Sequence, residues 1–80
     1  GRRNGPRFMK QVMPRYPLFA RRTGREGRVV LRLFIDEEGR LLDVEVVERA
    51  GFGFDESALE AVRMSTFLPA VKDGRPVKSR

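Results

Sequence analysis

The chain has 80 residues, which suffice for one small domain, and it contains neither Cys nor His. Without these residues there is no disulfide, no thiolate or imidazole ligand for a metal, and no cysteine nucleophile or histidine base, so we expect no enzyme, no cofactor and no metal site. The net charge of +6 and the 40% hydrophobic content are typical of a basic globular domain, and no apolar run is long enough to span a bilayer.

The positive charge is concentrated in the first part of the chain. Residues 1–32 carry ten Lys or Arg against one acid, Glu26, whereas residues 33–80 carry seven basic and ten acidic residues. Such a basic segment can contact nucleic acid, anionic lipid or an acidic protein, and it can equally be a solvated leader. Residues 1–13 have no sustained periodicity, so we predict a basic linker remnant or flexible leader there and a domain over residues 14–80.

Two prolines flank an aromatic residue at the start of the predicted domain. The segment Pro14-Arg15-Tyr16-Pro17 is predicted to be extended, because a proline disfavours helical backbone in the residue before it. Pro17 then opens a short helix over residues 18–22, which Gly24 stops. Tyr16 can either pack and fix this helix or offer a flat amphipathic surface to a partner.

From residue 28 the apolar residues alternate with a period of two, which is typical of a strand. One face of this strand carries Val29, Leu31, Leu33 and Ile35. Residues 36–39 form a turn in which Gly39 is available for a positive φ, and the alternation resumes over residues 41–48. The sequence therefore predicts a β-hairpin.

Gly51-Phe52-Gly53 breaks the second strand, and a helical pattern follows. Asp55 is predicted to be the N-cap of this helix, with Phe54 and Leu59 forming a hydrophobic staple. The helix should bury an apolar stripe made of Ala58, Leu59 and Val62. Its opposite, exposed face should carry the charged residues Glu56, Glu60 and Arg63.

The last part of the chain carries a second turn signal. Phe67 is predicted to be buried after the helix, and Asp73-Gly74 is a hairpin-type turn. A strand then begins near Pro76, and we expect it to be cut off at Arg80. The order predicts an α+β fold with a short lead-in helix and a small antiparallel hairpin or sheet packed against one α-helix, because a two-stranded ribbon alone is only marginally stable.

This order and its marker residues resemble the C-terminal domain of the TonB family. The resemblance spans about residues 14–77. It rests on an ordered set of short motifs: Pro14-Arg15-Tyr16-Pro17, Ala20, Glu26-Gly27-Arg28-Val29, Asp36-Glu37-Glu38-Gly39-Arg40, Asp43-Val44-Glu45-Val46, Phe54-Asp55, Ala58-Leu59, Ala61-Val62-Arg63, Phe67-Leu68-Pro69-Ala70 and Asp73-Gly74-Arg75-Pro76-Val77.

The resemblance implies that the chain is the periplasmic interaction domain of an energy transducer. Members of the family are anchored in the inner membrane by an N-terminal helix, absent from this chain, and are driven by proton-powered motor proteins. Their C-terminal domain binds the TonB box, a short extended segment of TonB-dependent outer-membrane transporters that import siderophores, vitamin B12 or similar cargo. The resemblance implies no catalysis by the domain itself.

The resemblance also indicates where a partner would bind. Because the family continues with a strand whose edge pairs with the box, the domain is expected to be truncated before its last strand. The edge available here is then made of Arg75, Pro76, Val77, Lys78, Ser79 and Arg80. The second candidate is the lead-in motif of Pro14, Arg15, Tyr16 and Pro17. The box would bind as an added β-strand, and free edges of two chains can instead pair as a homodimer.

Two other classes of function stay open. The chain can be a small basic α+β module that binds nucleic acid through Arg2, Arg3, Arg7 and Arg15, or an envelope scaffold domain without a transporter partner. Only Phe8 and Tyr16 lie among these arginines, and RNA-binding signatures are absent, so no nucleic-acid partner is expected.

Overall fold

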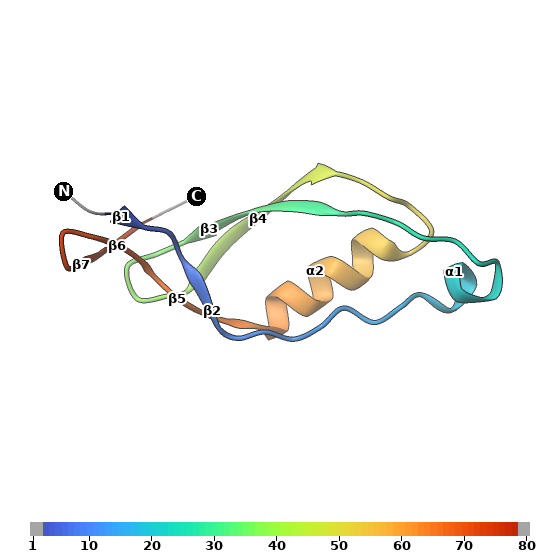
Figure 1. The fold of residues 1–80 in the computed structure, drawn as a ribbon, viewed down its shortest axis with the longest axis horizontal. Helices are drawn as coiled ribbons and strands as arrows, with labels where there is room; N and C mark the ends of the chain where they lie inside the picture. The colour runs from blue at the N-terminus through green and yellow to red at the C-terminus, as the bar shows by residue number, and fades with distance from the viewer. Residues whose placement is uncertain (1–2, 79–80) are drawn as a thin grey trace.

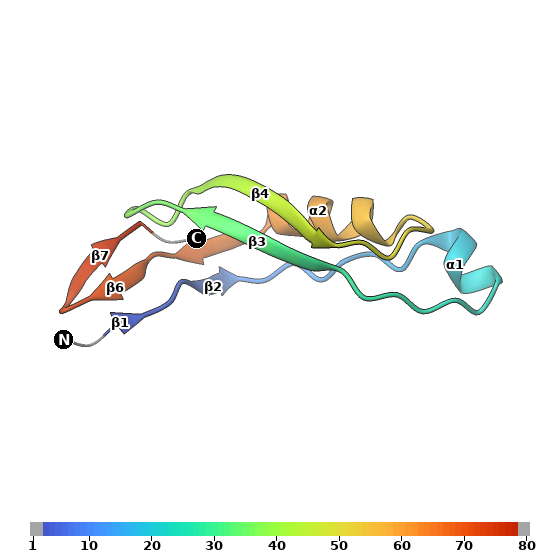
Figure 2. The ribbon, with the colours of Figure 1, turned by 90° about the horizontal axis from the view of Figure 1, so that it is seen from above.

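The computed structural model describes residues 3–78 of the chain. Within that range it has two helices and seven short strands, in the order β1 (Arg3–Asn4), β2 (Arg7–Lys10), α1 (Leu18–Arg22), β3 (Val30–Ile35), β4 (Leu41–Glu48), α2 (Phe54–Met64), β5 (Thr66–Leu68), β6 (Ala70–Lys72) and β7 (Arg75–Val77). The strand pairs are antiparallel and α2 is the main helix, so the predicted α+β fold is confirmed. The molecule measures 48 × 20 × 18 Å, with β7 and α1 at opposite ends (Figure 1, Figure 2).

The predicted hairpin is present as β3 and β4. Leu31 lies opposite Val46 and Leu33 opposite Val44, so the alternating apolar residues of both strands share one face. The turn between the strands is held by Asp36, which is buried. Its Oδ1 accepts hydrogen bonds from the backbone N–H groups of Glu38 (2.9 Å) and Arg40 (2.8 Å), and its Oδ2 pairs with the Arg40 Nε at 2.7 Å. Gly39 has a φ of 83°, as the sequence predicts.

We expect Asp36→Asn to lower the melting temperature at neutral pH, because an amide donor would face the Arg40 guanidinium. Burial raises the pKa of the Asp36 carboxyl, but its hydrogen bonds with Arg40 and Glu38 outweigh burial and hold the pKa below its ordinary value of 3.8. A depressed folded-state pKa gives stability that is present above 3.8 and is lost as the pH falls through the folded value.

Thermal unfolding measured from pH 7 downwards tests this expectation. The difference between the native chain and Asp36→Asn should be constant above the ordinary carboxyl pKa and should shrink below it. Glu37→Gln is the matched control, because Glu37 is exposed in the same turn. A difference that does not change with pH would contradict the role of the Asp36 charge.

Helix α1 forms where the sequence predicts it, directly after the extended Pro17 (φ −61°, ψ 135°). The chain leaves the helix through Thr23, and Gly24 follows with a φ of 65°. Ala20 is the buried residue of this short helix. The prediction that Gly24 stops the helix is therefore confirmed to within one residue.

Helix α2 differs from the prediction at its first turn. The N-cap is Gly53, with a φ of 85°, and Phe54 is already helical. Asp55 is therefore not the N-cap, and Phe54 is not placed to form the predicted staple with Leu59. The buried Asp55 carboxylate instead accepts hydrogen bonds from the backbone N–H groups of Ala50 and Gly51, both at 2.9 Å. It ties the helix to the preceding loop rather than to its own free N–H groups.

The charged face of α2 is exposed as predicted, and the helix ends at Met64. Ser65 takes an extended conformation, and its hydroxyl donates to the Ala61 carbonyl at 2.7 Å. The same hydroxyl accepts a hydrogen bond from the Val12 backbone N–H at 2.9 Å. Ser65 thus ends the helix and fastens the segment before α1 to it.

The basic leader is less irregular than the sequence predicts. Strand β2 pairs with β5, with Phe8 opposite Phe67 and their rings 5.1 Å apart, and β1 pairs with β6. The pairing is interrupted near Pro6 and Pro69, which have no N–H to donate. Residues 7–10 of the predicted basic leader thus form a strand, because a partner distant in the sequence orders them. The boundary between leader and domain at residues 13–14 stays a prediction.

The buried core is small. Its buried apolar residues in the described range are Ala20, Ile35, Ala61, Phe67 and Ala70, and Ile35 is the one large side chain among them that is fully buried. The burial predicted for Phe67 is thus confirmed. No helix in residues 3–78 has the length and hydropathy needed to cross a membrane.

Candidate functional site

An apolar groove of about 320 Å³ lies between β3, α2 and the segment before α1. One wall comes from the alternating residues of β3, the floor from α2, and the other wall from residues 8–14. The groove is lined by Phe8, Gln11, Val12, Pro14, Val29, Leu31, Leu33, Ala58, Ala61, Val62 and Ser65. Because these side chains are mostly aliphatic, the groove suits apolar side chains of a bound segment rather than a charged or metal ligand.

Strand β3 presents an open edge beside this groove. In the part of the chain that the structure describes, β3 pairs with β4 alone. Its other side therefore offers backbone N–H and C=O groups to a further strand. The predicted inner face of the hairpin, with Val29, Leu31 and Leu33, is only half-buried and faces the groove. An added strand would find backbone partners and an apolar surface at the same place.

Strand β7, which contains the predicted edge residues, is also at the end of its sheet. The sheet has the order β1-β6-β7, so the far side of β7 has no strand partner in residues 3–78. Asp73 and Gly74, with φ values of 52° and 76°, form the two-residue turn before it. Arg75 lies opposite Lys72 next to the turn, and Pro76 lies opposite Val71.

The geometry of this turn leaves the open edge of β7 with few backbone N–H groups that could donate hydrogen bonds to an added strand. In a two-residue hairpin the pair next to the turn exchanges hydrogen bonds, so the next residue, Pro76, directs its backbone outwards. Proline has no N–H to donate there. Val77 is half-buried and Lys78 is exposed, while Ser79 and Arg80 lie outside the described residues.

The predicted lead-in motif is an ordered part of the molecule. The Tyr16 hydroxyl donates to the Arg25 carbonyl, and its ring meets the Phe54 ring edge-on at a centroid distance of 5.5 Å. The Arg21 guanidinium lies 5.7 Å from the Tyr16 ring centroid. Of the two roles open for Tyr16, these contacts support packing that fixes α1. The motif lies towards α1, so it is not brought together with β7 (Figure 1, Figure 2).

Comparisons with known proteins agree with the resemblance in the sequence. The family described as Gram-negative bacterial TonB protein C-terminal matches residues 12–80. The chain belongs to this family. It is 39% identical over 71 residues to the protein TonB of Vibrio cholerae serotype O1, covering 88% of this chain and 29% of that protein. It is 33% identical over 64 residues to the protein tonB2 of Pseudomonas aeruginosa, covering 79% of this chain and 24% of that protein.

The matched region of this TonB-family domain includes both predicted binding segments and most of the groove lining. The chain spans less than a third of the length of these two relatives. The match therefore covers only one part of such a protein, and the activity of a whole TonB protein is a proposal for this chain.

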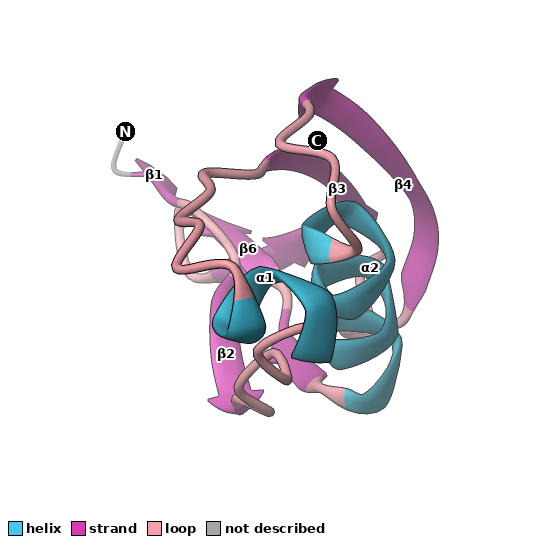
Figure 3. Cartoon of the chain, turned by 90° about the vertical axis from the view of Figure 1, so that its right-hand side faces the viewer, coloured by secondary structure: helices cyan, strands magenta, loops and turns pink. Residues whose placement is uncertain are grey.

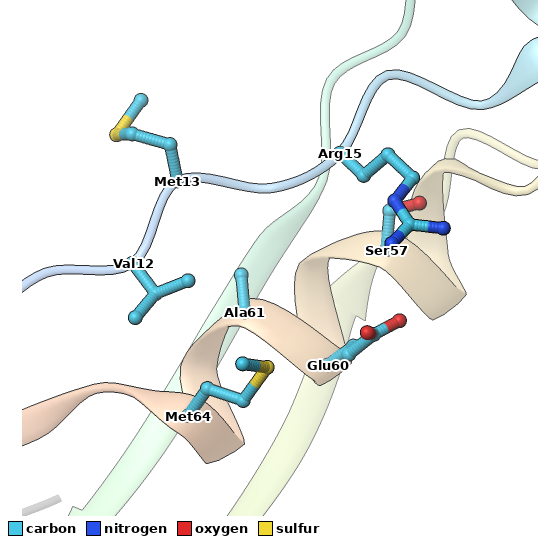
Figure 4. Close-up of a pocket in the computed structure, with 7 residues that line it drawn as sticks. All are labelled: Val12, Met13, Arg15, Ser57, Glu60, Ala61 and Met64. Carbon is cyan, nitrogen blue, oxygen red and sulfur yellow. The ribbon is translucent and has the colours of Figure 1, made fainter.

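A smaller hollow of about 150 Å³ lies between the segment before α1 and helix α2 of this TonB-family domain. Figure 4 shows Arg15 reaching from the segment before α1 over Ser57 towards Glu60 on α2, with the Val12 and Ala61 side chains lying between that segment and the helix. Met13 points away from the helix. Arg15 is thus directed at the domain's own helix, and Val12 and Ala61 line both this hollow and the apolar groove.

Sequence reasoning missed the groove of this TonB-family domain, although it predicted the strand and the helix that form two of its sides. The alternation of Val29, Leu31 and Leu33 predicts the inner face of a hairpin that the helix covers. The wall formed by residues 8–14 gave no signal, because Phe8, Val12 and Pro14 are spaced too irregularly to indicate that they share one face.

Proposed function

We propose that the chain is the interaction domain of a TonB-like energy transducer and that it captures the TonB box of an outer-membrane transporter by β-strand addition. The family membership supports the class of partner. The periplasmic location, the inner-membrane anchor, the coupling to proton-powered motor proteins and the uptake of siderophores or similar cargo are part of the same proposal. The domain acts by binding and pulling and needs no catalytic residue.

The observation that carries the proposal is the open edge of β3 beside the apolar groove. An extended segment placed there would make main-chain hydrogen bonds to β3 and direct alternate side chains towards Leu31, Leu33 and Val62. Five such bonds contribute about 0.5–1.5 kcal/mol each, and association costs at least about 4 kcal/mol in lost freedom. Burial of apolar side chains in the groove then leads to affinity in roughly the micromolar range, which suits repeated capture and release.

The predicted edge from Arg75 to Arg80 is the second location in this proposal. Its strand in the described residues, β7, has three residues against six in β3, and Pro76 has no N–H to donate. We therefore place the box at β3 and take contact at β7 as the alternative. The lead-in motif from Pro14 to Pro17 contributes through the Tyr16 hydrogen bond, and the Val12 hydrogen bond just before the motif helps to hold the same wall of the groove.

An NMR titration with a TonB-box peptide tests the proposal. We expect shifts along residues 29–33 that change little with salt, because backbone pairing depends weakly on ionic strength, whereas phosphate binding by a nucleic-acid module weakens steeply. Leu31→Ser should weaken binding by about tenfold or more, since a buried leucine contributes about 1.5–3 kcal/mol. Leu42→Ser is the matched control, because Leu42 is 57% exposed on β4 and does not line the groove.

A peptide with N-methyl groups at alternate residues separates strand addition from simple apolar contact. It should lose binding, because N-methylation removes the N–H donors. Unchanged binding of that peptide, or equal effects of the two leucine variants, would contradict strand addition at β3. Shifts confined to residues 75–78 would move the site to β7.

The same titration on the chain extended through its natural C-terminus tests the expectation that the family's last strand follows residue 80. If that strand fills the groove, the peptide shifts should move from β3 to the new strand. Pairing of two copies through their β3 edges would give a homodimer instead, which analytical ultracentrifugation detects as a doubled mass that decreases when the peptide is added.

A further inference from the structure

The end of the molecule that carries α1 exposes three large apolar side chains. Leu18, Phe19 and Phe52 are 60%, 58% and 46% exposed. They come from α1 and from the loop before α2, which lie at the end farthest from β1 and β7 (Figure 1). Figure 3 views the molecule from this end, with α1 nearest the viewer. We call this surface the α1 tip, defined by these three residues and the arginines beside them, Arg21, Arg22 and Arg25.

The aromatic residues of the α1 tip are held in place. The rings of Phe19 and Phe52 are stacked, with centroids 6.2 Å apart and planes 12° from parallel, and the Arg25 guanidinium lies 4.3 Å from the Phe52 centroid. Phe52 itself has a φ of 53°, which is unfavourable for a residue with a side chain. The Asp55 carboxylate holds the adjoining Gly51 N–H. The loop therefore keeps a strained aromatic residue in an exposed position.

The surroundings of the α1 tip are strongly basic. Arg21, Arg22, Arg25 and Arg28 lie within eight residues of chain, which contain one acid, Glu26. All four arginines are exposed. Arg28 is 3.5 Å from Glu48, and the other three have no carboxylate within ion-pair distance among the residues that the structure describes. Exposed aromatic and leucine side chains surrounded by arginines favour an anionic surface with an apolar interior.

We propose that the α1 tip binds membrane surfaces that contain anionic phospholipid. Leu18, Phe19 and Phe52 enter the interfacial region, and Arg21, Arg22 and Arg25 contact the lipid phosphates. The tip is the narrow end of an elongated molecule, and neither the apolar groove nor the smaller hollow includes its apolar residues. An end whose apolar side chains line neither of these hollows fits a soft, flat surface better than a folded acidic protein. This surface is separate from the groove, so the inference does not depend on the proposed function.

Co-sedimentation with vesicles tests the proposal. The chain should bind vesicles of phosphatidylglycerol and phosphatidylcholine in equal parts, should bind pure phosphatidylcholine far less, and should be released by salt. Arg22→Glu should lower the partition coefficient by at least about tenfold, since each charge near an anionic surface contributes about fivefold. Arg63→Glu is the matched control, because it makes the same charge change on the exposed face of α2, near the end of that helix away from α1.

A second pair of variants tests whether apolar side chains of the α1 tip insert into the membrane. Leu18→Ser should reduce binding to the anionic vesicles several-fold, whereas Leu42→Ser, at almost the same exposure, should leave it unchanged. Circular dichroism spectra check that all four variants keep their fold. Equal losses in Arg22→Glu and Arg63→Glu would overturn the proposal in favour of general attraction by a basic chain. Absence of vesicle binding, with binding to poly-glutamate that requires Arg22, would overturn it in favour of an acidic protein partner.

Discussion

Asp55→Ala should be among the most destabilising single substitutions in this chain. The carboxylate is buried and accepts hydrogen bonds from the backbone N–H groups of Ala50 and Gly51. Hydrogen bonds to a charged group contribute about 1.5–3 kcal/mol each, so the loss of both should lower the free energy of unfolding by about 3 kcal/mol or more. A domain of this size has roughly 4–12 kcal/mol in total, and the melting temperature should fall by roughly 10–20 °C.

The neighbouring residue provides the control for this prediction. Glu56→Ala removes a carboxylate from the same first helical turn, but Glu56 is exposed. Its loss should cost no more than about 1 kcal/mol through the helix dipole. Asp55→Asn should fall between the two, because an amide keeps one oxygen acceptor and loses the charge. Urea unfolding curves of the three variants measure the order, and equal effects of Asp55→Ala and Glu56→Ala would show that the loop contacts contribute little.

Features of the fold that depend on neighbours in sequence could be predicted. The alternation over residues 29–35 and 41–48 indicates a hairpin whichever way the rest of the chain folds, because period two places the apolar residues on one face. Gly39 and Asp73-Gly74 specify turns through their own backbone preferences. Pro17 likewise predicts the start of α1, since proline is compatible with the first turn of a helix.

Features that depend on distant partners could not be predicted in this way. Strand β2 has four residues and β5 has three, so neither carries a recognisable alternation, and their pairing becomes visible only when Phe8 is found opposite Phe67. Asp55 shows a different limit. An aspartate at the start of a helix is usually a cap, but the positive φ of Gly53 moves the cap two residues earlier and leaves the carboxylate facing the Ala50–Gly51 backbone.

The candidate site could be predicted only in part, because it combines local features of the sequence with contacts between distant segments. Sequence reasoning identified the hairpin face and the helix, yet the groove also needs residues 8–14, which Ser65 fastens through Val12. The predicted binding segments were chosen from the family resemblance, and their role is still a prediction. The geometry of β7 makes it a less suitable edge than β3, because Pro76 lacks the N–H donor that an added strand would need there.

The small core and the open groove are two aspects of one arrangement. Ile35 is the one large apolar side chain that is fully buried in residues 3–78, while Leu31 and Leu33 on the same strand, and Val29 just before it, are only half-buried. A bound strand would complete their burial, so binding should also stabilise the fold.

Gly39→Ala should be the second severe substitution, and the chain offers an unusually close control for it. Gly39 and Gly74 have φ values of 83° and 76°, so a side chain at either position costs about 1–2 kcal/mol in backbone strain. They differ in their surroundings. A Cβ on Gly39 would overlap the Phe67 carbonyl oxygen, whereas nothing lies within 4 Å of a Cβ on Gly74.

Gly39→Ala should therefore lower the free energy of unfolding by about 2–5 kcal/mol, the excess over strain coming from the overlap with a backbone atom. Gly74→Ala should lower it by about 1–2 kcal/mol. Chemical denaturation of both variants gives the difference directly. Because Phe67 is buried on β5, relief of the overlap requires the β3–β4 turn to separate from that strand. Equal losses in the two variants would mean that this turn is not packed against β5 in solution, and the hairpin wall of the groove would then be free to move.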